Sequence, residues 1–125
     1  MKIIIPIPPI TKKNSQILVT KPYPRVLPSQ RYRDYERDSR PYMPRGIEPI
    51  NEPVNVQMVF YMPTRRRVDL VNLQEACLDV LTKYGVIADD NCNVVATMDG
   101  SRVAYDKEKP RTEVLITKKG ERKDD

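Results

Sequence analysis

The chain has 125 residues, no His, and a formal net charge of +5 from 22 Lys and Arg against 17 Asp and Glu. The length predicts one small domain, the basic excess favours a polyanionic partner, and the lack of His excludes Ser-His-Asp and Cys-His catalysis. No apolar run could span a membrane and the N-terminus does not resemble a signal peptide, so we expect a soluble, cytoplasmic protein.

The first predicted elements are two short strands separated by a basic loop. Residues 2–7 are β-branched and contain Pro6, which predicts an edge position or the end of the strand. Residues 16–20 form the second predicted strand. Two interpretations of the loop between them are open: it is a solvated hairpin loop, or it contacts DNA phosphates through Lys12, Lys13 and Asn14.

Residues 23–49 are rich in Pro, Tyr and Arg and contain one predicted helix. Ser29 can cap a helix that starts after Pro28, and Pro41 and Pro44 prevent its continuation. The arginines and tyrosines of this region could follow a nucleic-acid backbone while the rings stack on bases. Equally, the tyrosines could pack on a sheet while the arginines are ordinary surface charge, and the sequence leaves both interpretations open.

Residues 53–62 give the strongest strand signal. Their alternation would place the apolar residues Val54, Val56, Met58 and Phe60 on one face, and it predicts a central or near-central strand. Residues 93–98 are the next predicted strand, and residues 102–105 are predicted to continue it past a Gly bulge. The last predicted strand is 112–117. We expect residues 1–117 to form the domain and residues 118–125 to be a charged, flexible tail.

Residues 65–95 combine a basic run, an amphipathic helix and an acidic turn. One face of the helix carries enough apolar side chains to pack on a core. Because each helical residue advances about 100°, the polar side chains fall within an arc of roughly 120°. They are Asp69, Asn72, Glu75, Asp79 and Lys83.

The acids of this helix can be interpreted in two ways. A charged stripe is usually a solvated face, and Asp69 can be a simple helix cap. However, Asp89, Asp90 and Asn91 follow Gly85, where the helix should end, and the chain can return beside the polar face. Converging carboxylates repel unless a divalent cation lies between them, and Mg²⁺ takes a few carboxylates while it keeps several waters.

These residues resemble the signature of the RusA family of Holliday junction resolvases, small phage and prophage endonucleases that cut four-way DNA junctions as Mg²⁺-dependent homodimers. The family pattern is approximately Asp-x-Asp-Asn-Leu-x-Lys-x-x-x-Asp-x-Leu, followed by a Gly and an Asp-Asp pair. The matching residues are Asp69, Asn72, Leu73, Asp79, Leu81, Gly85, Asp89 and Asp90. Residues 12–15, 99–103, 105–107 and 110–113 also resemble a Gram-positive phage branch of the family.

The resemblance implies a function for the whole chain. It implies a homodimer in the bacterial host cytoplasm, four-way junction DNA as the partner, and Mg²⁺, or alternatively Mn²⁺, as the cofactor. With the order of predicted elements, it implies one α+β domain with a mixed, mainly antiparallel sheet and helices on one face. A Gly-rich phosphate loop is absent, so ATP-driven functions are not expected.

The resemblance also implies site residues. Asp69 and Asp90 are the best candidate metal ligands. Further candidates for ligation or catalytic support are Asp79, Asp89 and Glu75. The DNA-binding candidates are Lys12, Lys13, Asn14, Arg65, Arg66 and Arg67.

Two departures from the family pattern change the predicted site. Val71 stands where the pattern has its second Asp, and Glu75 stands where it has the Lys. A carboxylate lost at one position and gained one helical turn later indicates that Glu75 has taken over ligation. The lost cation would help to stabilise charge on a phosphate, and Lys83 or the arginines at 65–67 could replace it. The alternative is a catalytically weak or inactive protein that binds branched DNA.

Overall fold

The structure is a computed structural model that describes residues 1–12 and 16–119. The predicted DNA contacts of Lys13 and Asn14 lie outside the described residues, as does most of the predicted tail. Within the described part of the chain, no helix has the length and apolar character needed to cross a membrane.

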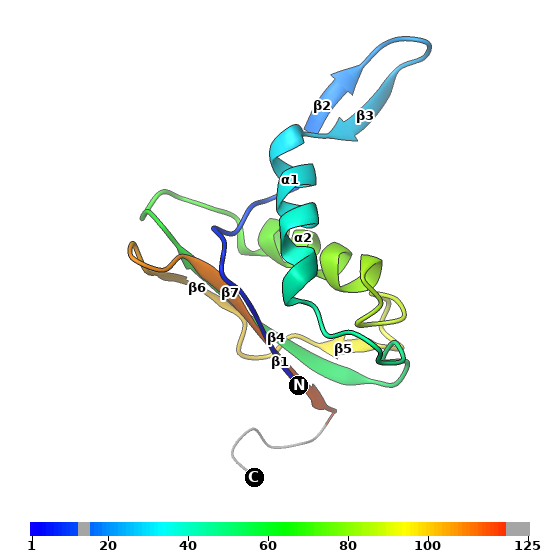
Figure 1. Cartoon of the computed structure of the whole chain (residues 1–125), viewed down its shortest axis with the longest axis vertical. Helices are drawn as coiled ribbons and strands as arrows, with labels where there is room; N and C mark the ends of the chain where they lie inside the picture. The colour runs from blue at the N-terminus through cyan, green and yellow to red at the C-terminus, as the bar shows by residue number, and fades with distance from the viewer. Residues whose placement is uncertain (13–15, 120–125) are drawn as a thin grey trace.

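A five-stranded sheet is the centre of the described part of the chain (Figure 1). Its strands run in the order β1-β7-β4-β5, and β6 also pairs with β4. β1 and β7 are antiparallel, as are β7 and β4, whereas β5 and β6 both run parallel to β4. The strands are β1 (Lys2–Ile5), β4 (Val54–Met62), β5 (Val95–Thr97), β6 (Arg102–Tyr105) and β7 (Arg111–Lys118). The predicted α+β class, the edge position of the first strand and the central position of β4 are confirmed.

β5 and β6 lie along the same edge of β4, one after the other, so the predicted continuation of this strand past Gly100 is confirmed. Between them Gly100 adopts a φ of 85°, and a Cβ atom at this position would collide with the side chain of Gln57. The backbone conformation therefore favours glycine, whereas the contact with Gln57 involves a flexible side chain that could move aside.

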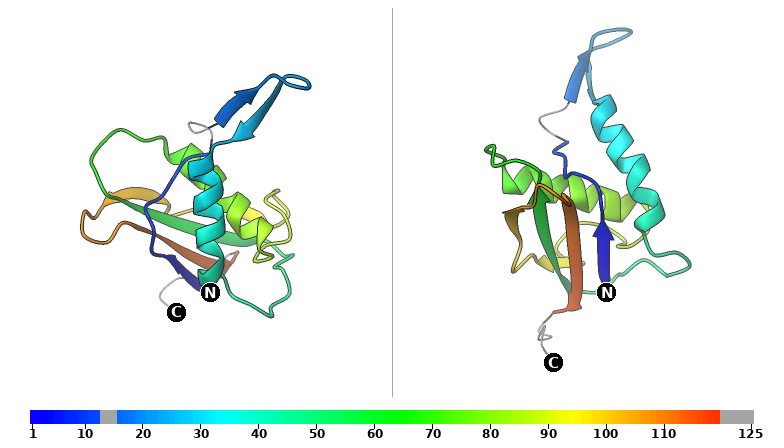
Figure 2. Two further views of the ribbon diagram at one scale, coloured as in Figure 1. Left: turned by 45° about the horizontal axis from the view of Figure 1, so that its top comes forward. Right: turned by 60° about the vertical axis from the view of Figure 1, so that its left-hand side comes forward.

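Both helices cover the same face of the sheet, as predicted (Figure 2). Helix α1 (Gln30–Ser39) begins at Ser29, whose hydroxyl oxygen accepts a hydrogen bond from the Tyr32 amide, and a short 3₁₀ helix, η2 (Arg40–Tyr42), follows it. Helix α2 (Leu70–Lys83) is capped by the Asp69 carboxylate, which accepts from the amide of Val71 at 3.0 Å. Gly85 then turns the chain with a φ of 73°. These predicted starts and stops are confirmed.

The core lies between α2 and the sheet and fixes the helix in place. It is formed by alternate side chains of β4 together with the inner face of α2, namely Val54, Val56, Met58, Phe60, Leu73, Cys77, Val80 and Leu81. Each such side chain contributes about 1.5–3 kcal/mol when fully buried. The outer face of α2 is therefore held on a rigid support.

Residues 25–28 form a strand that was not predicted from the sequence. β2 (Gln16–Val19) pairs with β3 (Arg25–Pro28) in a separate two-stranded sheet that projects from the body (Figure 1). β3 has only four residues and ends at Pro28, which is too short to show a period of two, so the sequence indicates only a Pro-rich stretch before the helix. The structure therefore adds β3 to the elements predicted from the sequence.

Candidate functional site

The outer face of α2 carries a short row of accessible side chains. Val71, Glu75 and Asp79 are spaced four residues apart and so lie one above the other on the helix surface. The side chain of Asp79 is 37% exposed, Glu75 is exposed, and Val71 is 58% exposed. Asn72 is only 8% exposed, so the polar face is narrower than the predicted arc. Val71 thus lies on the same row as the two acids.

The acidic turn returns to α2, as the Gly terminator predicted. After Gly85, Ile87 forms a parallel bridge with Ile50, and the amide of Ala88 donates to the carbonyl of Ile50 at 2.9 Å. This pairing directs the following residues back beside the helix. The result is that Asp90 lies within electrostatic reach of Asp79 on α2.

Desolvation and the neighbouring acids raise the pKa of Asp90. The largest cause is desolvation, followed by the hydrogen bond and charge of Asp89 and by the charge of Asp79. Asp89 has a different role, because one of its oxygens accepts from the amide of Asp90 at 2.7 Å and the other from the side chain of Asn91 at 3.1 Å. Asp89 therefore shapes the turn, and Asp90 is held among other acids.

Lys12 brings a positive charge to these acids from the N-terminal segment. Its Nζ atom lies 3.0 Å from a carboxylate oxygen of Asp79 and 5.6 Å from the ring centre of Tyr32. Tyr32 belongs to α1 and donates from its hydroxyl to the carbonyl of Ala76 on α2 at 3.5 Å. Burial, followed by the negative charge of Asp79, raises the pKa of Tyr32.

The other predicted cations lie elsewhere. Lys83 forms an ion pair of 2.5 Å with Glu36 on α1, and this contact raises the Lys83 pKa. Arg65 packs over the ring of Tyr105 at 4.2 Å. Arg66 and Arg67 are exposed immediately before Asp69. The basic run therefore lies at the N-terminal end of α2, and Lys83 is tied to α1.

Asp89 and Asp90 are neighbours in the turn and Asp90 lies within electrostatic reach of Asp79, whereas the remaining predicted acids are spread along α2. Glu75 is one helical turn from Asp79, whereas Asp69 is ten residues away, about 15 Å along the axis. Among residues 1–12 and 16–119, no group of three or more His, Cys, Asp or Glu side chains is arranged to hold a metal ion.

Sequence reasoning missed two partners of these side chains. The contact of Lys12 with Asp79 joins residues 67 positions apart, and that of Glu36 with Lys83 joins residues 47 positions apart. Periodicity reports only neighbours within one element, so no local signal could have found either pair.

Fold and site together define a small basic α+β domain that holds an acidic pair on a helix and the following turn, close to basic segments. The sequence model described as "Endodeoxyribonuclease RusA" matches residues 6–117. The chain therefore belongs to the RusA family of endodeoxyribonucleases, which confirms the resemblance.

Curated relatives match over a shorter segment. The "Crossover junction endodeoxyribonuclease RusA" proteins of Escherichia coli strain K12 and Shigella sonnei strain Ss046 are each 53% identical to the chain over 38 residues. The "Crossover junction endodeoxyribonuclease rusA" of Enterobacteria phage 82 has the same identity over the same length. In each case the match covers 30% of this chain and 32% of the relative, so the chain spans about a third of the length of these relatives.

Proposed function

We propose that the protein is an endodeoxyribonuclease that resolves four-way DNA junctions with a divalent cation, in the cytoplasm of a bacterial host. The observation that carries the proposal is the family match over residues 6–117. The position of Asp90 within electrostatic reach of Asp79 supports it: desolvation, then Asp89 and then the charge of Asp79 raise the pKa of Asp90, and a cation near these acids would offset their repulsion.

The donors at this point suit Mg²⁺, which prefers oxygen ligands and often takes only one or two carboxylates together with substrate phosphates. Asp79 and Asp90 would hold the cation, and Glu75, one turn along the exposed row, is the candidate additional ligand. Asp69, at the cap of α2, is a further candidate. When bound, the metal would lower the pKa of a bound water and offset charge on the phosphate.

Lys12 is the best candidate for the cation that the family pattern places at position 75. It already lies 3.0 Å from Asp79, whereas Lys83 is paired with Glu36. An ammonium group beside the acids would offset charge that builds up on the phosphate during cleavage. Arg66 and Arg67 would hold the DNA backbone near the start of α2.

A second proposal concerns assembly. Resolution of a four-way junction requires two symmetric cuts, and a homodimer with two-fold symmetry supplies two equivalent sites. Sedimentation of the free protein and of its complex with junction DNA tests this. A monomer under both conditions would rule out paired cutting.

The test of activity uses a synthetic four-way junction labelled on each arm and incubated with Mg²⁺, with Mn²⁺ and with a chelator. Symmetric nicks that need metal would support the resolvase. Val71 favours the alternative of a branched-DNA-binding protein, because it leaves an apolar side chain 58% exposed where the pattern has an acid. Tight binding without cutting would support that alternative.

Asp90→Asn separates the two functions more sharply. In a resolvase the change should abolish cutting while it preserves or tightens junction binding, because one negative charge facing the phosphates is removed. The matched control is Asp99→Asn, since Asp99 is an exposed turn acid after β5. The proposal is rejected if the two variants cut at the same rate.

A further inference from the structure

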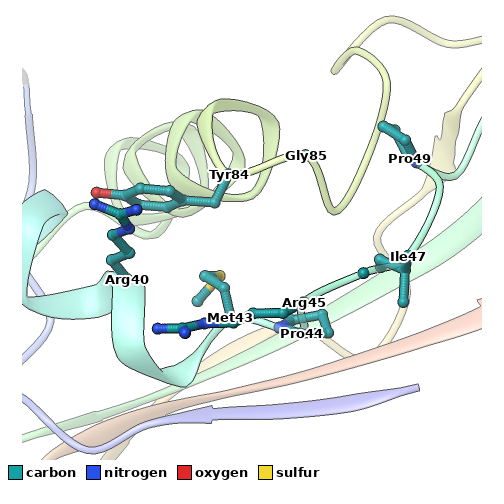
Figure 3. Close-up of a pocket in the computed structure, with 9 residues that line it drawn as sticks. Arg40, Met43, Pro44, Arg45, Ile47, Pro49, Tyr84 and Gly85 are labelled. Atoms are coloured by element: carbon teal, nitrogen blue, oxygen red, sulfur yellow. The ribbon is translucent and has the colours of Figure 1, made fainter.

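A cavity of about 390 Å³ lies at the C-terminal end of α2, apart from the acidic pair (Figure 3). Arg40 reaches it from the end of α1, and Tyr84 from the end of α2. The loop that carries Met43, Arg45 and Pro49 forms the remaining wall. The volume falls within the range of about 300–1,000 Å³ that is usual for ligand sites.

The charged residues that line this cavity are all basic. Two of its lining residues are Arg40 and Arg45, and none is Asp or Glu. Within residues 1–12 and 16–119, neither guanidinium group forms an ion pair or a hydrogen bond. Arg37, from the same region of sequence, instead pairs with Asp34 at 3.2 Å and Asp38 at 3.0 Å. The two cavity arginines are thus available to an external anion.

The remaining wall suits the uncharged part of a nucleotide. Met43 is buried beneath the cavity, and Pro49 and the ring of Tyr84 are further apolar surfaces. The Tyr84 hydroxyl donates to the carbonyl of Glu36 at 2.8 Å, which fixes the ring. Guanidinium groups bind phosphates in a bidentate manner, and aromatic rings stack on bases of any sequence.

We propose that this cavity binds the phosphates of one DNA strand next to the strand that is cut, with a sugar or base against Tyr84. This inference rests on the proposed function and adds a second contact surface to it. Tyr84 lies five residues after Asp79, about 7.5 Å along the axis of α2. This axial separation is short compared with a DNA duplex, so the proposal has one DNA molecule contact both the acidic pair and the cavity.

The assay measures binding of a labelled four-way junction in chelator over a series of salt concentrations. The test variant is Arg40→Gln/Arg45→Gln, which removes two exposed charges without partners and should leave the fold intact. The control variant, Lys107→Gln/Lys109→Gln, removes the same charge from the exposed turn between β6 and β7. Circular dichroism melting of all three proteins confirms that each is folded.

Removal of two phosphate contacts should reduce the slope of log K against log salt concentration by about 1.4 to 1.8, at 0.7 to 0.9 per contact. If affinities converge at 1 M salt, binding at 0.1 M becomes about 25- to 60-fold weaker. The control should keep the wild-type slope.

Equal loss in both variants would mean that only net charge matters and would overturn the inference. It would also be overturned if the cavity variant bound as the wild type does, and the proposed function would then stand. If the wild type itself binds no junction DNA, the proposed function fails first.

Discussion

Asp90→Asn should stabilise the metal-free protein at pH 7. Desolvation, then Asp89 and then the charge of Asp79 raise the pKa of Asp90, which means that folding disfavours its charged form. Asp90 is exposed, so solvent screens the repulsion, and we expect a gain of about 0.2 to 1 kcal/mol. For a chain of 125 residues this corresponds to a Tm increase of about 1 to 4 °C.

The pH dependence follows from the direction of the shift. An acid whose pKa is higher in the folded than in the unfolded state binds more protons when folded, so its ionisation destabilises the fold as pH rises. The penalty is complete above the raised pKa and absent below the ordinary value of 3.8. The Tm difference between Asp90→Asn and the wild type should therefore be present at pH 7 and vanish near pH 3.

Mg²⁺ should reverse the order of the Tm values, so that the wild type melts above Asp90→Asn. At a free Mg²⁺ concentration ten times the Kd, binding stabilises the wild type by about 1.4 kcal/mol, or about 5 °C in Tm. A variant without the ligand gains little. Melting curves by circular dichroism, with chelator and with Mg²⁺, measure both effects, and Asp99→Asn is the control that should follow the wild type. If Asp90→Asn melts below the wild type in chelator at pH 7, our interpretation of the acidic pair is wrong.

Three further predictions concern other parts of the chain. Burial raises the pKa of the Cys77 thiol to about 12, so a thiol reagent should modify the exposed Cys92 alone in the native protein and both cysteines after unfolding. Ser29→Ala removes the cap of α1 and should cost about 1 kcal/mol in urea unfolding, whereas an unchanged midpoint would contradict the observed cap. Lys12→Gln should slow metal-dependent cutting of a bound junction more than Lys83→Gln does, and single-turnover rates that are equal would remove Lys12 from its proposed role.

Most elements of the fold could be predicted from short-range sequence patterns. The caps at Ser29 and Asp69 and the terminator at Gly85 depend on residues within one turn of each helix end, so the sequence displays them directly. The alternation in β4 is long enough to specify both a strand and its buried face. β3 lacked any comparable signal because it has only four residues and ends at Pro28.

The sequence left open whether the tyrosines and arginines of residues 23–49 pack the fold or contact nucleic acid, and the structure gives different environments to different residues. Tyr32 and Tyr35 are buried, so they pack α1 against the core as in the structural interpretation. Arg37 is occupied by neighbouring acids, whereas Arg40 and Arg45 line a cavity that contains no acid. The acids that pair with Arg37 are its neighbours in sequence, at positions 34 and 38, so sequence proximity alone could have indicated these pairs. The cavity around Arg40 and Arg45 is formed by segments distant in sequence, so the sequence could not show that no acid lines it.

The charge arrangement of the site also explains why a change at one position of the family pattern need not remove the function. Glu75 adds a negative charge to α2 at the point where the pattern has a Lys, on the same exposed row as Val71 and Asp79. The lysine of α2, Lys83, is paired with Glu36 on α1, so it is not beside the acids to offset charge on a phosphate. The fold supplies Lys12 from a distant segment, 3.0 Å from Asp79. Because electrostatic stabilisation depends on where a charge lies in space, we propose that the lysine at residue 12 replaces the one that the family pattern has at residue 75.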